Sequence, residues 1–311
     1  MSRISFNIRH IWLLFLLFIF LCFGGCKNKE KPKENQPLRD NTPIVHTPKL
    51  SGSLVYEKDI LSLDCSETSS GYIALTYKGK NEKVKFQIKT PDKVTYTYLV
   101  SEYNKPIIFP LTDKSGLYTF VLYEAVDAKE DLYAIVFQQE LKVQITDPFL
   151  PYLTPNIYTQ FTQDCGCVVK SCELALECYC DLDVIENIYL YVTKNITYDQ
   201  EKAQNVSYGY IPNPDKTLSS KKGICFDYAS LMTAMLRSQR IPTKLEVGYA
   251  GNVYHAWISC YVKEIGWIDN IIEFDGEHWS LMDPTLAANN NRNEVKDYIG
   301  DGSKYIVKYT Y

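Results

Sequence analysis

The 311-residue sequence has few histidines and no excess of basic residues, and each shortage narrows the functions it can have. Lysine and arginine total 33 against 37 acidic residues, which gives a formal net charge of −4. This balance provides no broad basic surface, so nucleic-acid binding is not expected. The histidines are His10, His46, His255 and His278. Any histidine-dependent chemistry must therefore use one of these four side chains.

Long apolar runs are also missing. The most apolar stretch, residues 11–23, has 13 residues, whereas a membrane-spanning helix needs about 20. Arg3 and Arg9 precede this stretch, and Gly24 and Gly25 follow it. A positive start, a short apolar core and small residues before a processing point describe a secretory signal peptide over residues 1–25. An extracytoplasmic protein is therefore predicted.

The residues after this signal predict an anchor and a linker. Cys26 follows two glycines and resembles the lipid-modified cysteine of a bacterial lipobox, although Phe23 and Gly24 depart from the usual leucine and alanine. We expect lipid attachment at Cys26 and a location at the cell membrane; the alternative is an ordinary cysteine beside a signal peptide. Residues 26–50 are rich in lysine, glutamate, asparagine and proline, which cannot bury enough surface to fold. They are expected to form a flexible tether.

Residues 51–147 show a hydrophobic period of two. Turn residues separate strand-like runs at 72–77, 84–88, 94–98, 118–122 and 133–137. Several short strands at regular spacing, each with one apolar face, predict an antiparallel β-sandwich. No catalytic constellation occurs in this region, so we expect a spacer or packing module. A ligand-binding role is the alternative, and no motif supports it.

Beyond residue 147 the period becomes helical, and two helices are expected around residues 168–175 and 184–191. Five cysteines are crowded into this region. A zinc site is disfavoured because C-x-C spacing on a helix points the two thiols apart and no histidine lies nearby. Core thiols, or one or two disulfides, are the expected alternatives. The cysteines are Cys165, Cys167, Cys172, Cys178 and Cys180.

The next helix carries the first candidate for chemistry. Its apolar face predicts a helix that begins near Cys225 and ends before Pro242. At a helix N-terminus the free amides and the positive end of the dipole favour a thiolate. A lowered pKa makes a thiol a nucleophile at neutral pH. Cys225 is therefore a candidate nucleophile.

The second candidate lies in a predicted hairpin. Strand-like runs at 243–249 and 254–262 flank a glycine-containing turn. Apolar residues alternate with His255 along the second run, so His255 is expected to point away from the buried side of its strand. A lone histidine in a strand is often merely accommodated there. His278, in a predicted turn, is the weaker candidate base.

Asp283 ends a short strand-like run and precedes a proline. If the strands are neighbours, its carboxylate could accept the imidazole N–H of His255 and fix the catalytic tautomer. An aspartate before proline is otherwise a common start of a turn.

Four blocks, taken in order, resemble the transglutaminase-like superfamily. They are Gly-Ile-Cys-Phe-Asp-Tyr-Ala-Ser-Leu from 223, Ile-Pro-Thr-Lys-Leu-Glu-Val-Gly-Tyr from 241, His-Ala-Trp from 255, and Trp-Ser-Leu-Met-Asp-Pro-Thr from 279. Asn-Ile-Thr-Tyr-Asp, from 195, is similar to the lead-in segment of that family. Ordered agreement of several blocks is far more specific than one Cys/His pair.

The resemblance covers residues 148–311 and implies an α+β protein: an N-terminal antiparallel β-sandwich followed by a papain-like transglutaminase-like domain. It implies that Cys225 is the nucleophile, His255 the base and Asp283 the orienting acid. Two positions depart from the family pattern. Ser259 stands where members often have glutamate, and Arg240 stands where a glycine often precedes Ile-Pro.

The implied activity is that of a thiol enzyme acting on peptide or carboxamide bonds through an acyl-thioester, as a peptidase, amidase or protein-glutamine acyltransferase. The Cys225 N–H is one expected oxyanion donor, and Tyr208 and Tyr210 are candidates for the second. No metal or cofactor is expected, and the sequence has no regular calcium loop. Substrates would be peptides or proteins, including cell-envelope peptides. The alternative is a non-catalytic surface lipoprotein that binds peptide or protein.

Overall fold

The computed structural model describes residues 37–127, 131–250, 252–274, 279–281 and 305–311. The chain divides into two units, Met1–Pro37 and Leu38–Tyr311, and every element named below belongs to the second. None of the described helices is both long and apolar enough to cross a membrane. The predicted signal peptide and the residues Cys26, His278 and Asp283 lie outside the described residues.

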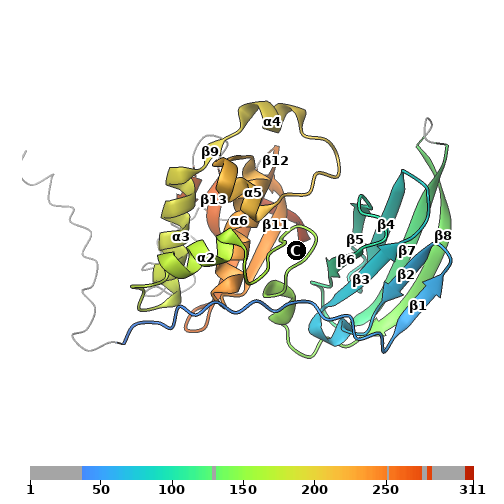
Figure 1. The fold of residues 1–311 in the computed structure, drawn as a ribbon, viewed down its shortest axis with the longest axis horizontal. Coiled ribbons are helices and arrows are strands. Elements are labelled where there is room, and N and C mark those ends of the chain that lie inside the picture. The colour runs from blue at the N-terminus through green and yellow to red at the C-terminus, as the bar shows by residue number, and fades with distance from the viewer. Residues whose placement is uncertain (1–36, 128–130, 251, 275–278, 282–304) are drawn as a thin grey trace, which may run out of the picture. The chain divides into compact units, whose positions relative to one another are not determined.

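Two four-stranded antiparallel sheets form the first half of the second unit (Figure 1). One has the order β1-β2-β3-β6 and the other the order β5-β4-β7-β8. Four of the five strand-like runs predicted from the sequence lie within these strands, and the fifth, 94–98, begins one residue before β5. The bounds are β1 (Val55–Lys58), β2 (Leu61–Asp64), β3 (Tyr72–Tyr77), β4 (Val84–Lys89), β5 (Thr95–Leu99), β6 (Pro106–Pro110), β7 (Gly116–Asp127) and β8 (Leu132–Val143), with a short 3-10 turn at Thr68–Ser70.

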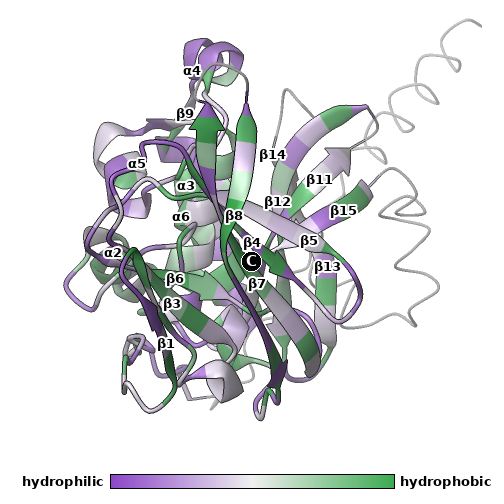
Figure 2. Cartoon of the chain, turned by 90° about the vertical axis from the view of Figure 1, so that its right-hand side faces the viewer, coloured by the Kyte–Doolittle hydropathy of each residue, from purple (hydrophilic) through white to green (hydrophobic). Residues whose placement is uncertain are grey.

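Alternation of side chains across each strand builds the sandwich core. Hydrophobic and hydrophilic residues alternate along strands of the two sheets (Figure 2). In β4, Val84, Phe86 and Ile88 are buried while the residues between them are less so. The Phe86 ring lies 4.9 Å from the ring of Phe109, which belongs to the opposite sheet. Full burial of such a side chain contributes about 1.5–3 kcal/mol. These contacts hold the two sheets face to face.

The second half is mixed α and β. A five-stranded antiparallel sheet has the order β14-β13-β12-β11-β15, and a short parallel pair joins β9 to β10. The strands are β9 (Thr197–Tyr198), β10 (Lys222–Gly223), β11 (Thr243–Ala250), β12 (Val253–Val262), β13 (Gly266–Phe274), β14 (Trp279–Leu281) and β15 (Tyr305–Thr310). The helices are η2 (Leu150–Tyr152), α2 (Gly166–Leu174), α3 (Asp181–Asn195), α4 (Gln200–Asn205), α5 (Pro214–Ser220) and α6 (Cys225–Ser238).

Helix α6 lies at the centre of this half. It packs on β11 and β12 and also contacts α2, α3 and α5, which surround it in Figure 1. Every residue from Asp227 to Ser238 is buried, although the sequence predicted one apolar face. The helix ends where Arg240 adopts a φ of 65°, a left-handed conformation that favours glycine. The family pattern often has glycine at this position.

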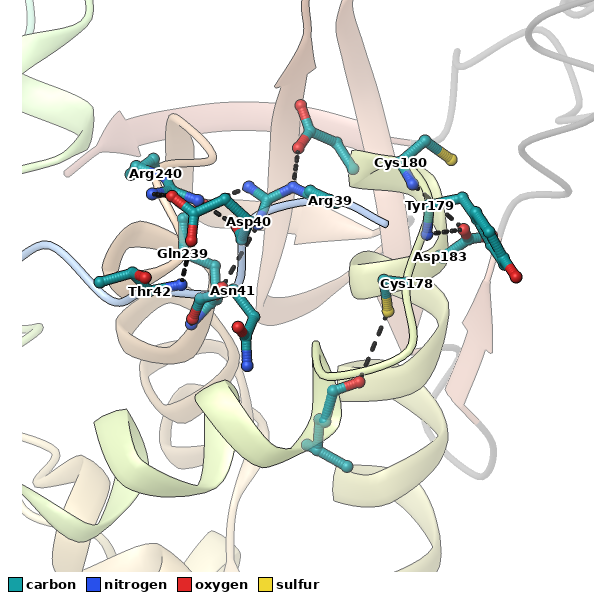
Figure 3. Close-up of polar contacts among 12 residues, drawn as sticks. Arg39, Asp40, Asn41, Thr42, Cys178, Tyr179, Cys180, Asp183, Gln239 and Arg240 are labelled. Atoms are coloured by element: carbon teal, nitrogen blue, oxygen red, sulfur yellow. Dashed lines mark hydrogen bonds and ion pairs between the residues drawn. The ribbon is translucent and has the colours of Figure 1, made fainter. Parts of the chain in front are cut away.

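Part of the predicted tether packs against the second half (Figure 3). The Ile44 N–H donates to the carbonyl of Ser238 at 2.8 Å, and Arg39 donates to the carbonyl of Gln239. The last carbonyls of a helix have no partner within the helix. Here donors from the N-terminal segment satisfy those of α6. Hydrogen bonds, rather than apolar burial, therefore hold Arg39 to Ile44, and composition alone gave no sign of them.

The described cysteines are free thiols, including all five between residues 165 and 180. Cys167 and Cys178 are buried, which agrees with the expected core thiols, whereas Cys180 is exposed. Burial raises the pKa of the Cys167 thiol, and the nearby Asp215 carboxylate adds to the effect. No group of three or more histidine, cysteine or acidic residues that could hold a metal ion occurs among the described residues.

Candidate active site

The first residue of helix α6 is Cys225, as the sequence predicted. Ile224 precedes it with an extended backbone, and the Ile224 N–H donates to the Asp227 carboxylate at 2.8 Å. This bond caps the helix start. A Cβ atom on Gly223 would lie only 2.6 Å from the Cβ of Asp227. Glycine at 223 therefore allows the carboxylate to fold back beside the nucleophile.

The groups around the Cys225 thiol shift its pKa in opposite directions. Burial raises its pKa, and the backbone N–H groups of Ala256 and Phe226 and the hydroxyl of Tyr198 act in the lowering direction. The net direction is upward. The expectation that the helix N-terminus lowers the pKa is therefore not met, because burial is the larger effect. A thiol in this state needs a base close by to become a nucleophile.

His255 lies on β12, the central strand of the five-stranded sheet, opposite Gly248 of β11. It is only 8% exposed, and Trp257 and Ser259 on the same face are also buried. The expectation that His255 points away from a buried side is therefore wrong, because both faces of β12 are covered. His255 and Cys225 nevertheless line the same cleft, and the N–H of the residue after His255 contacts the thiol.

A buried carboxylate beneath the His-Ala-Trp block was not predicted. Glu246 on β11 accepts hydrogen bonds from Trp257 Nε1 at 3.1 Å and from Ser259 Oγ at 2.6 Å. Burial raises the pKa of Glu246, and the bond from Ser259 acts in the opposite direction. Ser259 stands where family members often have glutamate, and here the neighbouring strand supplies the carboxylate. One acidic residue between apolar Leu245 and Val247 was the available sequence signal.

A tyrosine that interacts with the nucleophile is neither of the two predicted oxyanion candidates. The Tyr210 hydroxyl donates to Asp227 at 2.5 Å and accepts from Lys202 at 2.6 Å, and Tyr208 is 75% exposed. Tyr198, in the lead-in segment, interacts with both the thiol and the backbone N–H of Cys225. Burial raises the pKa of Tyr198 to about 12, so its hydroxyl stays protonated at neutral pH.

Cys225 opens into a cleft of about 1140 Å³ whose walls are rich in tyrosine. Strand β5 of the sandwich supplies part of the wall through Thr97 and Leu99, so this module reaches the candidate site. A Cβ on Gly209, whose φ is 82°, would lie 2.5 Å from Leu99 Cδ1. Close packing of β5 against the loop at residues 206–210 therefore requires glycine. The aromatic lining residues are Tyr158, Tyr198, Tyr208, Tyr210, Phe226, Tyr249, Tyr254, Tyr309 and Tyr311.

Comparison with known proteins agrees with the sequence resemblance. Residues 175–270, which include Cys225 and His255, match the model of the transglutaminase-like superfamily. The protein UPF0252 MJ1282 of Methanocaldococcus jannaschii is 39% identical over 69 residues, which are 20% of this chain and 20% of that protein. The match thus spans about a fifth of that relative. This part of the chain is therefore similar to the transglutaminase-like superfamily.

Two solved structures share similarity with most of the chain. A candidate cysteine protease from Cytophaga hutchinsonii aligns with 77% of this chain and 83% of its own, at 14% identity and a TM-score of 0.37. The periplasmic domain of TgpA from Pseudomonas aeruginosa aligns with 78% of each chain, at 14% identity and a TM-score of 0.32.

Proposed function

We propose that this chain is a thiol enzyme that cleaves peptide or carboxamide bonds through an acyl-thioester on Cys225. One observation carries the proposal: Cys225 opens helix α6 inside the cleft that His255 also lines, and the Ala256 N–H beside the histidine contacts the thiol. A helix N-terminus facing an imidazole is the arrangement that activates a cysteine nucleophile. Asp283 stays a proposal for the group that orients the imidazole; the strand before it in the sequence, β14, pairs with β13 and is not a neighbour of β12.

The reaction proceeds in two balanced halves. His255 accepts the thiol proton as the sulfur attacks the substrate carbonyl carbon, and the C–N bond then breaks as His255 returns the proton to the leaving amine. Water or a second amine attacks the thioester, His255 takes its proton, and the C–S bond breaks to restore the thiol. Because burial raises the Cys225 pKa, proton transfer to His255 accompanies attack in place of a standing thiolate.

Two donors can stabilise the oxyanion of the tetrahedral intermediate. The Cys225 N–H is the first, and we assign the second to the Tyr198 hydroxyl, because it lies against both the thiol and this N–H. Tyr210 is committed to Asp227 and Lys202. Tyr208 contributes to the wall of the cleft.

The substrates and the location follow from the predicted N-terminus. A signal peptide over residues 1–25 and a lipid on Cys26 would place the cleft outside the cytoplasm, at the cell membrane. Cell-envelope peptides or extracellular proteins are then the available acyl donors. Water as acceptor gives a peptidase or amidase, and an amine gives a protein-glutamine acyltransferase.

Mass spectrometry of the protein after incubation with peptidoglycan peptides and with casein-like proteins tests this function. We expect an acyl adduct on Cys225 together with cleaved or cross-linked product, and neither in Cys225→Ala. Cys172→Ala is the matched control, since Cys172 is a partly exposed free thiol that does not line the cleft. It should retain both signals.

The alternative function is that of a surface lipoprotein whose domain binds peptide without turnover. The raised pKa of Cys225 and the tyrosine-rich cleft also suit such a role. Alkylation separates the two. Iodoacetamide labelling of Cys225 that is no faster than labelling of Cys172, and that is unchanged in His255→Ala, would favour the binding module.

A further inference from the structure

The carboxylate of Asp227 is buried two residues after the candidate nucleophile. Its side chain is 1% exposed, yet both of its oxygens have partners. One oxygen accepts from the Ile224 N–H at 2.8 Å and from Lys202 Nζ at 2.5 Å. The other accepts from the Tyr210 hydroxyl at 2.5 Å. Three donors therefore surround this buried carboxylate.

The position of the Asp227 carboxylate works against the proposed chemistry. Negative charge close to a thiol disfavours its thiolate, and Asp227 acts on the Cys225 pKa in the raising direction. The positive end of the α6 dipole acts only over the first turn, and it would stabilise negative charge on both Cys225 and Asp227. The site therefore needs a positive charge that offsets Asp227.

Lys202 supplies a positive charge beside Asp227, and its helix fixes the lysine in this position. It belongs to α4, where its backbone N–H donates at 3.0 Å to Asp199, the cap of that helix. Asp199 directly follows Tyr198, whose hydroxyl contacts the thiol. One short segment, residues 198–202, therefore meets the nucleophile on one side and the carboxylate on the other.

The charged and titratable groups around the thiol come from several elements. His255 on β12 and Tyr198 on β9 share its cleft, and Asp227 lies on its own helix. Lys202 and Tyr210 stand behind Asp227, with the Lys202 ammonium 4.2 Å from the centre of the Tyr210 ring. Lys202 is 29% exposed, so solvent screens part of its charge.

We propose that Lys202 is a positioning residue for Cys225: it neutralises the buried Asp227 carboxylate, so that the helix N-terminus can stabilise the thiolate formed during attack. This role rests on the proposed thiol chemistry. The bond from Tyr210 to the same carboxylate ties the cleft-lining loop at residues 206–210 to the nucleophile helix.

The test is the pH profile of Cys225 alkylation by iodoacetamide, read on the peptide that contains Cys225, across about pH 5 to 10. We expect Lys202→Met to raise the midpoint by about one pH unit, because it leaves an uncompensated carboxylate beside the thiol. Lys202→Arg should restore the wild-type midpoint. Lys170→Met, which removes a lysine paired with Glu173 outside the cleft, should leave it unchanged.

The double variant Lys202→Met/Asp227→Asn separates charge from shape. It removes the lysine and the carboxylate charge together, so its midpoint should return to the wild-type value or fall below it. A midpoint as high as in Lys202→Met, or no shift in Lys202→Met itself, would overturn the proposal. Should Lys202→Met fail to fold, Lys202→Gln removes the same charge and should raise the midpoint in the same way; an unchanged midpoint in Lys202→Gln would overturn the proposal.

Different results would contradict the proposed enzyme function and the proposed role of Lys202. If wild-type Cys225 alkylates no faster than Cys172, with a profile that His255→Ala leaves unchanged, the proposed enzyme function fails. If wild-type Cys225 is reactive and dependent on His255, but Lys202→Met keeps the wild-type midpoint, only the role of Lys202 fails.

Discussion

The two halves of the described chain differ in what their interiors contain. Between residues 51 and 147 the buried side chains are apolar or aromatic, apart from Thr90. Beyond residue 147, polar and charged side chains are buried throughout, and each needs a partner to offset the loss of water. The sandwich gains its stability from buried apolar area, whereas the second half gives up part of that gain to hold polar groups in place. Examples are Asp227, Arg237, Glu246, His255 and Ser259.

The largest effect expected from this comparison is a pure loss of stability in the sandwich. Phe86 is fully buried between Phe109 and Phe120. Phe86→Ala should lower the free energy of unfolding by about 3–5 kcal/mol, from lost transfer energy and the cavity left behind. Urea denaturation measures the loss. The alkylation rate of Cys225 in the folded protein should not change.

Leu117→Ala is the control for this prediction, since Leu117 is 55% exposed on β7 of the same module. It should change the unfolding free energy by about 0.5 kcal/mol or less. An equal loss in both variants would mean that the sandwich is not stabilised by its apolar interior.

Replacement of a buried polar residue in the other half should affect both the stability of the protein and the alkylation of Cys225. Buried Arg237 donates to the carbonyls of Thr154, Thr243 and Tyr311 at 2.8–3.0 Å. Burial lowers the pKa of Arg237 to about 9. Arg237→Met would leave these carbonyls without that donor and should cost about 3 kcal/mol. Because Tyr311 lines the cleft, alkylation of Cys225 should change as well.

Arg240→Met serves as the matched control, because Arg240 pairs with the largely exposed Asp40 at 2.8 Å. Its removal should cost about 1 kcal/mol or less. If Arg237→Met were as stable as this control, the buried polar groups of the second half would not hold its structure together.

The same contrast explains what the sequence could predict. A period of two is a local signal, so the five sandwich runs were visible. Cys225 and His255 could be found by residue type and by the order of the blocks that contain them. Partnerships across the fold left no such signal. Lys202 and Asp227 are 25 positions apart, and nothing in the sequence distinguishes this lysine among 33 basic residues. Burial of both faces of β12 likewise depends on tertiary packing.

The contribution of the buried Glu246 side chain to stability should depend on pH. Burial raises its pKa in the folded state, so folding favours the protonated form. Its contribution to stability is therefore fully present below the unfolded pKa of about 4.3 and declines as the pH rises toward the folded value. Glu246→Gln lacks this titration. Thermal unfolding from about pH 4 to 7 should show the variant gaining on the wild type as the pH rises; a constant difference would contradict burial as the cause.

The smallest expected effect concerns Leu99, because it tests whether the sandwich also contributes to the cleft. Leu99 belongs to the sandwich but packs on Gly209 and lines the cleft. Leu99→Ala should lower stability by about 1 kcal/mol, since only part of the side chain is buried. It should also reduce the alkylation of Cys225 by an aromatic chloroacetamide by about threefold relative to iodoacetamide, because the larger probe loses this wall. Leu117→Ala should leave the ratio between the probes unchanged. If Leu99→Ala behaves in the same way, the sandwich is only a spacer; a change confined to Leu99→Ala makes β5 part of the substrate site.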